Sequence, residues 1–478
     1  MPDMDMLMTT LDASALAELV RTKQIAPTEL MEGALSRMER LNPLLNAVVS
    51  LDVDLARSKA KSVAQEGIFA GVPTLIKDVL AYPGLPLSMG GDFLPPFKVP
   101  MGSPYTDALD ASGLVVVGKS ATSELGLLGT TESVCRPPVA NPWNLRLSAG
   151  GSSGGAVAAV ASGMVPIAHA SDGGGSIRGP SSFCGLFGFK PSRGRTVSNG
   201  LPEDMPMAQL LSEHCVTRSV RDSFSWLQMT ERSSWQMKLP TQDAIKKRHH
   251  RLRIGFHTTS SSGLSPEQDA KDAVLTAVRA CEALGHSVVD VTPPGVDMDA
   301  AAKAFFALGG ASVSNALDYF RSIFGDAFAD DKLERYTKAL ASHGRGVDVS
   351  ALDAASQTLR RVAHDLDAAI SGYDVLLCPT VPFPAFELGK FTGDKDFEAL
   401  NAFIASVAQY TFPASVAGWP AMSVPLFWNE DGLPMGCHFA AGHGQDDVLL
   451  SLAFELEEAL PWQPRLKQLM DRLDAAAP

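Results

Sequence analysis

Glycine and serine are concentrated in two neighbouring stretches whose order could serve nucleophilic catalysis. GGSSGG occupies positions 150–155 and runs directly into the apolar AVAAVASGMVPIAHA, whereas polar sequence would flank a flexible linker. This predicts a buried helix with Ser152 or Ser153 at its start, where free N–H groups and the helix dipole favour developing negative charge. In SDGGGSIRG, three glycines could turn several amides toward one point ahead of Ser176. Such loops suit a nucleophile with its oxyanion hole, or tight packing corners beside strands.

A serine nucleophile needs a partner that takes its proton, and the sequence offers two kinds. His169 is the nearest histidine, but it lies in an apolar run, where a satisfied core histidine is expected, and no histidine accompanies a Gly-x-Ser-x-Gly elbow. Lys77 ends the apolar run VPTLI, where desolvation would lower its pKa and leave neutral amine to act as a base. The alternative is a strand-end lysine that reaches solvent beside Asp78.

The segment GLVVVGKS, from Gly113 to Ser120, matches the phosphate-loop pattern of two glycines followed by Lys-Ser. That mechanism needs a mobile loop between the glycines, whereas the run from Leu114 to Val117 is apolar and β-branched and predicts a strand. Lys119 is therefore expected to begin a solvated or structural turn after the strand. Nucleotide binding stays as an alternative hypothesis, which ATP binding that is lost in Lys119→Ala would support.

An α/β framework must position these groups. Apolar residues at three- and four-residue spacing, broken by Pro27 and by Asn42-Pro43, predict an N-terminal helical layer over residues 1–65. From Gly71, short apolar runs such as GVPTLIKDVL and SGLVVVGKS predict buried strands with helical crossovers. RLRIGFHTT and DAVLTAVRACEALGHSVVDVTPP predict a strand, a helix and a strand, and YDVLLCPTVPFPAF and WPAMSVPLFWNEDGLPMGCHFAAG predict late strands. No segment is typical of an interdomain linker, so one large domain is expected.

Composition limits the partners. Fifty-three acidic and forty basic residues give a net charge of −13, which argues against nucleic acid or an anionic membrane as a partner. The N-terminal MPDMDMLMTT has no signal-peptide core, and no uncharged apolar run of about 18 residues follows, so a cytoplasmic location is expected. The six cysteines lack CxxC spacing, and we expect buried thiols rather than disulfides, metal ligands or cofactor ligands at Cys135, Cys184, Cys215, Cys281, Cys378 and Cys437.

Several of these motifs together resemble the amidase signature family: GVPTLIKD, AGGSSGGAVAAVASGMVPIAHASDGGGSIRGPSSFCGLFGFKPSRGR, and the late LLCPTVP and GLPMGCHFAAG. The resemblance covers nearly the whole chain. It implies a single large α/β domain, residues 1–478, with a central mixed β-sheet covered by helices on both faces. Within it, residues 71–200 would form the signature core, 201–347 a variable region that supplies pocket walls, and 370–478 the C-terminal part of the core.

Members of this family use a Ser-cisSer-Lys triad, and the motifs place it residue by residue. Ser176, which precedes Ile-Arg, falls on the nucleophile, Ser152 on the serine that follows a cis peptide, and Lys77 on the base. The family's oxyanion hole falls on the amides of Gly173, Gly174, Gly175 and Ser176. The resemblance thus implies a hydrolase that forms a serine acyl-enzyme and needs no cofactor or metal.

Three further residues are expected to support the triad. Ser153 resembles the neighbouring serine that orients the lysine, while Asp172 and Arg178 are expected to form an ion pair that braces the loop. Around the nucleophile, many members have Gly-Thr-Asp and Pro-Ala where this chain has Ala-Ser-Asp at 170–172 and Pro-Ser-Ser at 180–182. These departures leave the triad unchanged and limit what can be said about the substrate.

The substrate class is indicated by HCVTRSVRDS, from His214 to Ser223, which resembles the broad-specificity branch that acts on aryl, linear or cyclic oligomeric amides, including nylon-type oligomers and carbamates or urethanes. The stretches LPEDMPMAQLL (201–211) and AAAKAFFALGG (300–310) could line an apolar pocket, or belong to the core. We expect a monomer or homodimer that hydrolyses small hydrophobic amides and also esters. The alternative is a glutaminase subunit of a tRNA-dependent amidotransferase.

Overall fold

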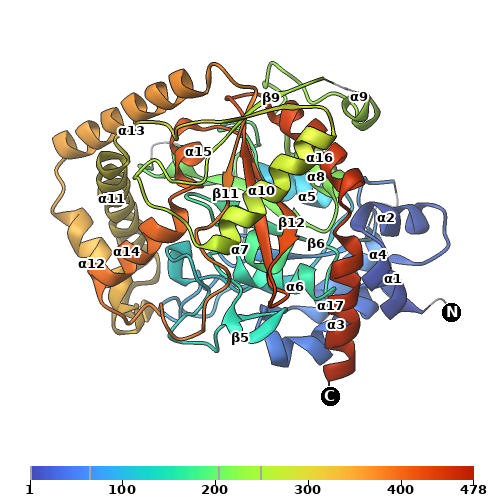
Figure 1. The fold of residues 1–478 in the computed structure, drawn as a ribbon. Helices are drawn as coiled ribbons and strands as arrows, with labels where there is room; N and C mark the ends of the chain where they lie inside the picture. The colour runs from blue at the N-terminus through green and yellow to red at the C-terminus, as the bar shows by residue number, and fades with distance from the viewer. Residues whose placement is uncertain (1–2, 64–65, 203–204, 248–249, 478) are drawn as a thin grey trace.

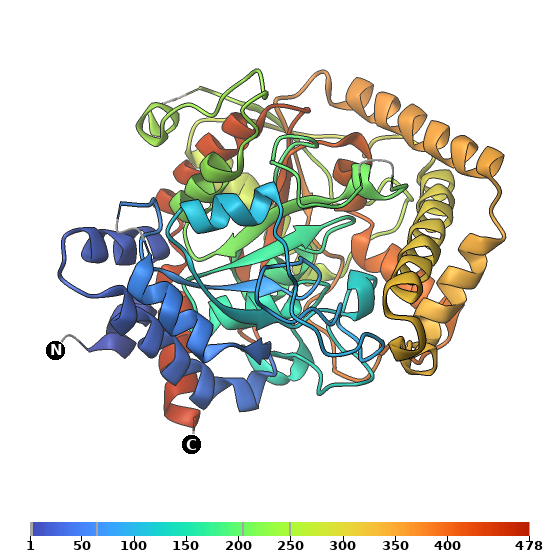
Figure 2. The ribbon, with the colours of Figure 1, turned by 180° about the vertical axis from the view of Figure 1, so that it is seen from behind.

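A mixed sheet of eleven strands runs through the centre of the molecule, counted over the residues that the computed structural model describes, 3–63, 66–202, 205–247 and 250–477. Helices cover both faces of the sheet, and the chain forms one large α/β domain (Figures 1 and 2). In order across the sheet, the strands are β1 (Val48–Leu51), β3 (Val115–Ser120), β2 (Pro73–Lys77), β6 (Ile167–Asp172), β8 (Ser212–Thr217), β7 (Phe187–Lys190), β12 (Ala421–Trp428), β13 (Pro434–Ala440), β11 (Val375–Pro379), β9 (Arg253–Phe256) and β10 (Ser287–Asp290). A separate ribbon pairs β4 (Ala140–Asn141) with β5 (Asn144–Ser148).

The helices gather into layers around this sheet. They are α1 (Met4–Thr10), α2 (Ala13–Arg21), α3 (Pro27–Leu45), α4 (Val53–Ser62), α5 (Pro104–Ala111), α6 (Gly154–Ala161), α7 (Arg178–Cys184), α8 (Val220–Thr230), α9 (Gln242–Lys246), α10 (Gln268–Ala283), α11 (Met298–Phe324), α12 (Arg335–Arg345), α13 (Val349–Ile370), α14 (Phe397–Ala408), α15 (Phe412–Ala417), α16 (Asp446–Ala459) and α17 (Gln463–Ala476). Short 3-10 turns are η1 (Glu124–Gly126), η2 (Ala208–Leu210), η3 (Gly325–Ala327) and η4 (Asp330–Lys332). Helices α11, α12 and α13 pack together at one end of the molecule, and α1 to α4 lie with α17 at the other (Figure 1).

Strand directions confirm the α/β class and the mixed sheet that the sequence predicts. β2 runs parallel to both β3 and β6, whereas β6 and β8 are antiparallel, as are β12 and its neighbours β7 and β13. β9, α10 and β10 form the predicted strand, helix and strand, with the two strands parallel. Because β2 and β6 are parallel neighbours, their carboxyl ends meet at one edge of the sheet.

Two local expectations are wrong. Pro43 does not break the N-terminal helix, because α3 continues to Leu45 and is ended by Asn46 in the left-handed region; a proline in the last turn removes only one helical hydrogen bond. Lys119 does not begin a turn, because β3 includes it and continues to Ser120. The Lys119 ammonium is fully buried and donates to the carbonyl oxygen of Leu80 at 2.5 Å. Residues 115–120 therefore form a strand rather than the mobile loop that would enclose phosphate.

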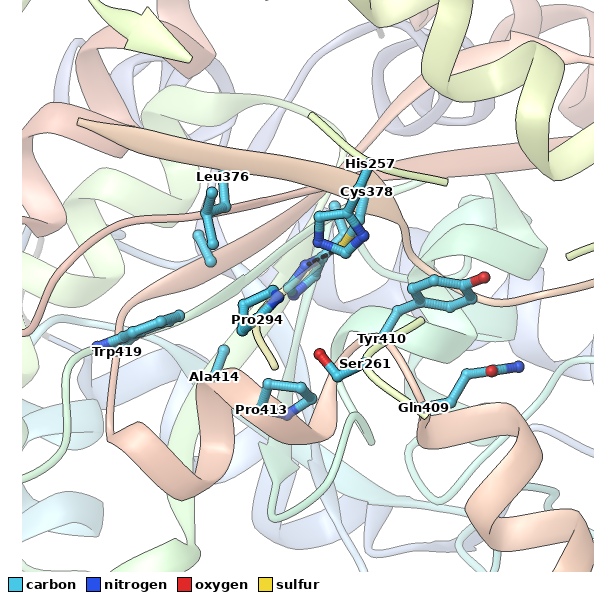
Figure 3. A pocket seen from close by; sticks show the side chains of 12 residues that line it. His257, Ser261, Pro294, Leu376, Cys378, Gln409, Tyr410, Pro413, Ala414 and Trp419 are labelled. Atoms are coloured by element: carbon cyan, nitrogen blue, oxygen red, sulfur yellow. Dashed lines mark hydrogen bonds between the residues drawn. The ribbon is translucent and has the colours of Figure 1, made fainter. Parts of the chain in front are cut away.

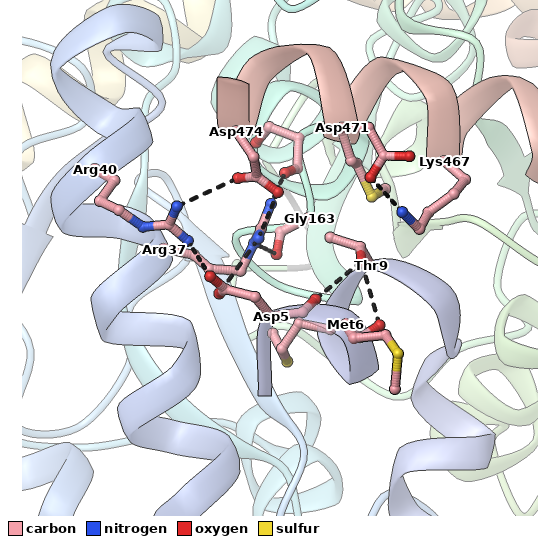
Figure 4. Close-up of polar contacts among 12 residues, drawn as sticks. Asp5, Met6, Thr9, Arg37, Arg40, Gly163, Lys467, Asp471 and Asp474 are labelled. Atoms are coloured by element: carbon pink, nitrogen blue, oxygen red, sulfur yellow. Dashed lines mark hydrogen bonds and ion pairs between the residues drawn. The ribbon is translucent and has the colours of Figure 1, made fainter. Parts of the chain in front are cut away.

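The N-terminal and C-terminal helices are joined by a buried arginine that also anchors α6 (Figure 4). Arg37 of α3 donates through Nε to Gly163 O at 2.8 Å and through Nη2 to Ser162 O at 3.0 Å, which satisfies carbonyls just beyond the end of α6. Its Nη1 lies 3.0 Å from Asp474 of α17 and 3.4 Å from Asp5 of α1. This contact fixes the helix whose other end begins beside Ser152.

The cysteines are buried with one exception. Cys135 is exposed, contrary to expectation, because it lies in the loop 133–138 between η1 and β4, and all six thiols are free. No helix in the described part of the chain combines the length and the apolar character that a membrane crossing requires.

Candidate active site

Lys77 and Asp172 lie at the carboxyl ends of the parallel strands β2 and β6. The apolar run that forms β2 is buried along its whole length, and Lys77 at its end is only 1% exposed. The solvent-exposed alternative for Lys77 is therefore wrong. A lysine with so little access to water must find its hydrogen-bond acceptors within the protein.

Ser152 is placed by the glycine-rich turn between β5 and α6. The peptide bond between Gly151 and Ser152 is cis, and Ser153 is the N-cap residue of α6, which is buried throughout. A Cβ at Gly151 would lie 2.3 Å from the carbonyl oxygen of Thr130, so any larger residue would collide with backbone. The small residues of GGSSGG therefore meet a packing requirement, and the expected buried helix follows them.

The Lys77 ammonium contacts two serine hydroxyls. Its Nζ lies 2.7 Å from Ser152 Oγ and 3.0 Å from Ser171 Oγ, and Ser152 is as deeply buried as Lys77. Burial lowers the pKa of Lys77 to about 8, against the opposing influence of the negative charges on Glu213 and Asp172. A substantial fraction of this amine is therefore neutral in mildly alkaline solution, so it can accept a proton from Ser152.

Ser176 lies beyond β6, after three glycines, and is more accessible than Ser152. Gly175 has φ of +142°, and a Cβ there would lie 2.3 Å from Thr411 Oγ1. Thr411 Oγ1 also donates to the carbonyl oxygen of Gly174 at 2.6 Å and thereby fixes one face of the loop. The hydrogen bonds of the described residues join Lys77 to Ser152 but do not extend to Ser176; such contacts often tighten only when substrate binds.

Asp172 and Arg178 form the expected ion pair across this loop. Both side chains are fully buried, with Arg178 Nη2 at 2.8 Å from Asp172 Oδ1 and Nε at 2.9 Å from Oδ2. Asp172 also accepts the backbone N–H of Ile177 at 3.2 Å, and Arg178 Nη1 donates to Thr411 O at 2.7 Å. Burial opposes the charge on Asp172, but Arg178 outweighs it and holds the pKa of Asp172 at about 2. The pair therefore joins the two ends of the loop that carries Ser176.

Ser171, to which the sequence assigns no role, contacts the lysine, whereas Ser153, which is expected to orient it, does not. Ser153 Oγ donates to the carbonyl oxygen of Ser171 at 3.2 Å and does not contact Lys77 directly. The hydroxyl next to the lysine belongs instead to Ser171, two residues from His169 on β6. Its signal was present in the sequence as the serine before Asp172, but only the strand pairing shows that it faces Lys77.

Apolar side chains lie on two sides of the site, one beside the loop that carries Ser176 and the other beside the turn that carries Ser152. A Cβ at Gly173 would lie 3.1 Å from Leu211 Cδ2, and one at Gly126 would lie 3.4 Å from Ser152 Oγ. On the first side, a cluster brings together Met207, Leu210, Phe305 and Phe412, with the rings of Phe305 and Phe412 at 5.1 Å. On the second side, Leu125 and Leu127 flank Gly126 and belong to a cluster that includes Met89, Phe93 and Phe306. The stretches 201–211 and 300–310, which the sequence offers as pocket walls, thus both contribute to these clusters. Glu203 and Asp204 of the first stretch lie outside the described residues.

A small cavity of about 30 Å³ lies beside the ion pair of Asp172 and Arg178 (Figure 3). His438 lines it and contacts Arg178 Nη1 through Nε2 at 3.0 Å, while Tyr410, Trp419 and His257 form other parts of its wall. This volume suits a few water molecules rather than an organic substrate. Over the described ranges, no three His, Cys, Asp or Glu side chains gather so that they could hold a metal ion.

Comparison with known proteins identifies the family and the relatives that this chain resembles. The family model described as Amidase matches residues 29–450. The chain is 37% identical over 460 residues to a protein named as amidase AmiC from Mycobacterium tuberculosis (strain ATCC 25618 / H37Rv), which covers 95% of each chain. It is 33% identical over 481 residues to 6-aminohexanoate-cyclic-dimer hydrolase from Paenarthrobacter ureafaciens, covering 96% of this chain and 97% of that protein.

Solved structures have the same fold. A 6-aminohexanoate cyclic dimer hydrolase complexed with substrate superposes with a TM-score of 0.89 at 31% identity, covering 97% of this chain and 99% of the other. A bacterial aryl acylamidase of the amidase signature family gives a TM-score of 0.86 at 26% identity, covering 97% and 98%.

Proposed function

Because the chain belongs to the amidase signature family, a group of C–N hydrolases, we propose that it hydrolyses amides through an acyl-enzyme on Ser176. The observation that supports this most directly is the buried contact of Lys77 Nζ with Ser152 Oγ at 2.7 Å, beside the glycine loop that carries Ser176. Ser176 is the nucleophile, Ser152 the proton relay and Lys77 the base. The same three residues act in both halves of the reaction.

The proton path follows from the donors and acceptors. Neutral Lys77 takes the proton of Ser152 Oγ, which takes the proton of Ser176 Oγ as that oxygen attacks the acyl carbon. When the tetrahedral intermediate collapses, the path reverses and the leaving nitrogen receives the proton, which releases the amine. Water then attacks the acyl-enzyme and gives its proton to the same relay, so the carboxylic acid leaves and Ser176 is restored.

Charge on the intermediate is stabilised by backbone amides. The N–H groups of Gly173, Gly174, Gly175 and Ser176 are the candidate oxyanion donors. The contact of Thr411 Oγ1 with Gly174 O and the two hydrogen bonds of Arg178 to Asp172 support this loop before substrate arrives. Pre-set donors of this kind act where little water competes, and each contributes about 3 kcal/mol to transition-state stabilisation.

The substrates are small hydrophobic amides, including aryl amides and cyclic or linear aminohexanoate oligomers. Support comes from the two apolar clusters beside the loop and the turn, and from relatives whose names specify a cyclic dimer and an aryl acylamide. Aryl esters and carbamates should also react, because an alkoxide or phenoxide leaves with less protonation than an amine needs. Glutamine, which is charged at both ends of its backbone, should bind poorly beside these clusters.

A substrate panel tests this proposal. The purified chain alone should hydrolyse a nitroanilide and at least one of a linear and a cyclic 6-aminohexanoate dimer, along with a p-nitrophenyl ester and a toluene-type dicarbamate. Glutamine should remain intact. Hydrolysis of glutamine alone, or activity that begins only when a second protein is added, would show that the chain is a glutaminase subunit instead.

A further inference from the structure

A histidine and a glutamate lie directly behind the lysine, and the proposed chemistry does not use them. His169 is fully buried on β6, and its Nδ1 lies 3.2 Å from the backbone nitrogen of Lys77. Its Nε2 lies 2.8 Å from Glu213 Oε2 on β8, and Asn199 Nδ2 donates to the other Glu213 oxygen at 2.7 Å. Glu213 is the cross-strand partner of Ser171, whose hydroxyl contacts Lys77 Nζ.

The hydrogen bonds determine which group carries the charge. The backbone N–H of Lys77 can only donate, so Nδ1 of His169 accepts and the ring proton lies on Nε2. Nε2–H then donates to Glu213, which must accept from both His169 and Asn199 and is therefore a carboxylate. The pair is thus a neutral imidazole and an anion, buried behind the end of β2.

We propose that His169 and Glu213 are positioning residues for Lys77: the imidazole holds the backbone of the lysine in register, and the carboxylate supplies a fixed negative charge that strengthens the base. This inference rests on the proposed role of Lys77 as the base. A stronger base takes the Ser152 proton more completely, and the ammonium form then holds that proton until the leaving nitrogen, which is more basic once the C–N bond breaks, takes it through Ser152.

Other charged groups around Lys77 agree with this arrangement. Asp172 of β6 adds a second negative influence, while Lys119 of β3 adds positive charge that helps to keep His169 neutral. Burial is the main cause of the lowered pKa of His169, and the Tyr105 ring packs edge-on against the imidazole at 5.6 Å. Burial opposes the charge on Glu213, but the hydrogen bonds from His169 and Asn199 hold the pKa of Glu213 below its usual value.

Glu213→Gln tests the proposal, with Glu231→Gln as a matched control. The two glutamate side chains are 9% and 8% exposed, and Glu231 pairs with Arg195 rather than with the lysine. In Glu213→Gln, the acid limb of the kcat/KM profile should move to lower pH by roughly 1 unit, and the plateau rate should fall because the base is weaker. In Glu231→Gln, the acid limb of the kcat/KM profile should stay at the same pH as in the wild type. His169→Phe, which keeps a ring against Tyr105, should move the limb in the same direction as Glu213→Gln.

A direct titration of Lys77 keeps this test separate from that of the proposed function. With 13C label at the lysine ε carbon, the Lys77 signal is identified by its loss in Lys77→Arg, and its midpoint should move to lower pH in Glu213→Gln. An unchanged midpoint, or a move to higher pH, would overturn the role assigned to Glu213. If Lys77→Ala retains amide hydrolysis, the proposed function fails, and the titration still decides whether the pair controls Lys77.

Discussion

Lys77 Nζ and Ser152 Oγ lie 2.7 Å apart at a point where both side chains are 1% exposed. A proton can therefore pass between them without passing through solvent. The position of each depends on a different feature of the fold: Lys77 on the end of a fully buried strand, and Ser152 on a turn of small residues at the start of α6. Their contact thus joins two segments that are far apart in the sequence.

Removing any member of the proposed triad should abolish most of the activity. Ser176→Ala, Ser152→Ala and Lys77→Ala should each lower kcat by about 1,000-fold or more, and a double variant should be little worse than the worst single one, because one relay fails as a unit. Steady-state kinetics on a nitroanilide measure this. Ser162→Ala is the control: Ser162 is equally buried at the other end of α6, and the variant should stay close to wild type. Activity that survives in Ser176→Ala would contradict the assignment.

Activity should rise with pH as Lys77 loses its proton. Burial lowers the pKa of Lys77 to about 8, and the neutral amine is the competent form, so kcat/KM should increase through pH 8 and stay high in more alkaline buffer. The profile should be the same with a metal chelator present. Activity that a chelator removes and zinc restores would point to a metal-dependent hydrolase.

Gly151→Ala should damage both the fold and the site. The added methyl group would lie 2.3 Å from the carbonyl oxygen of Thr130, and the three nearest atoms are all backbone atoms of Thr130, which cannot turn aside as a side chain can. We expect a lower melting temperature and a fall in kcat, measured on the same preparation. Gly372→Ala is the matched control, since nothing lies within 4 Å of a Cβ there. Equal behaviour of the two variants would show that the turn is not as tightly packed as described.

The α/β class and several strands, such as β2, β3 and β11, could be predicted from the sequence because these strands are short apolar runs. β1 lies within residues 1–65, which the sequence predicts to be helical, and β8 has the polar sequence SEHCVT, so no apolar pattern marks either as a strand. The surroundings of Lys77 could not be predicted either. A lysine at the end of an apolar run fits burial and exposure equally well, and only the coverage by Ser152 and Ser171 decides between them. Glu213 lies 44 positions beyond His169, so their contact depends on the pairing of β6 with β8, which no local pattern specifies.

Breaking the buried ion pair should destabilise the protein in a pH-dependent way. Asp172→Asn leaves Arg178 without its carboxylate and should cost about 3–5 kcal/mol of unfolding free energy near neutral pH. The pKa of Asp172 is lowered to about 2, so the stabilisation is present above the usual carboxyl pKa and is lost as the pH falls through about 2. The difference between variant and wild type in denaturant titrations should therefore shrink in acid.

An exposed ion pair provides the control for that experiment. Asp330 contacts Arg321 with more than half of its own side chain exposed, so Asp330→Asn should cost no more than about 1 kcal/mol. A similar loss in the two variants would mean that Asp172 does not brace the loop. Asp172→Asn should also lower kcat, because the loop between Asp172 and Arg178 carries Ser176 and the candidate oxyanion amides.

The site of acylation tests the central claim most directly. The protein is mixed with a fluorophosphonate, or with a p-nitrophenyl ester whose acyl group leaves the enzyme slowly. It is then quenched in acid and analysed by intact mass and by peptide mapping. We predict one adduct per chain, on Ser176, and none in Ser176→Ala. An adduct on another residue with Ser176 unmodified, or continued amide hydrolysis by protein whose Ser176 is fully modified, would contradict the account.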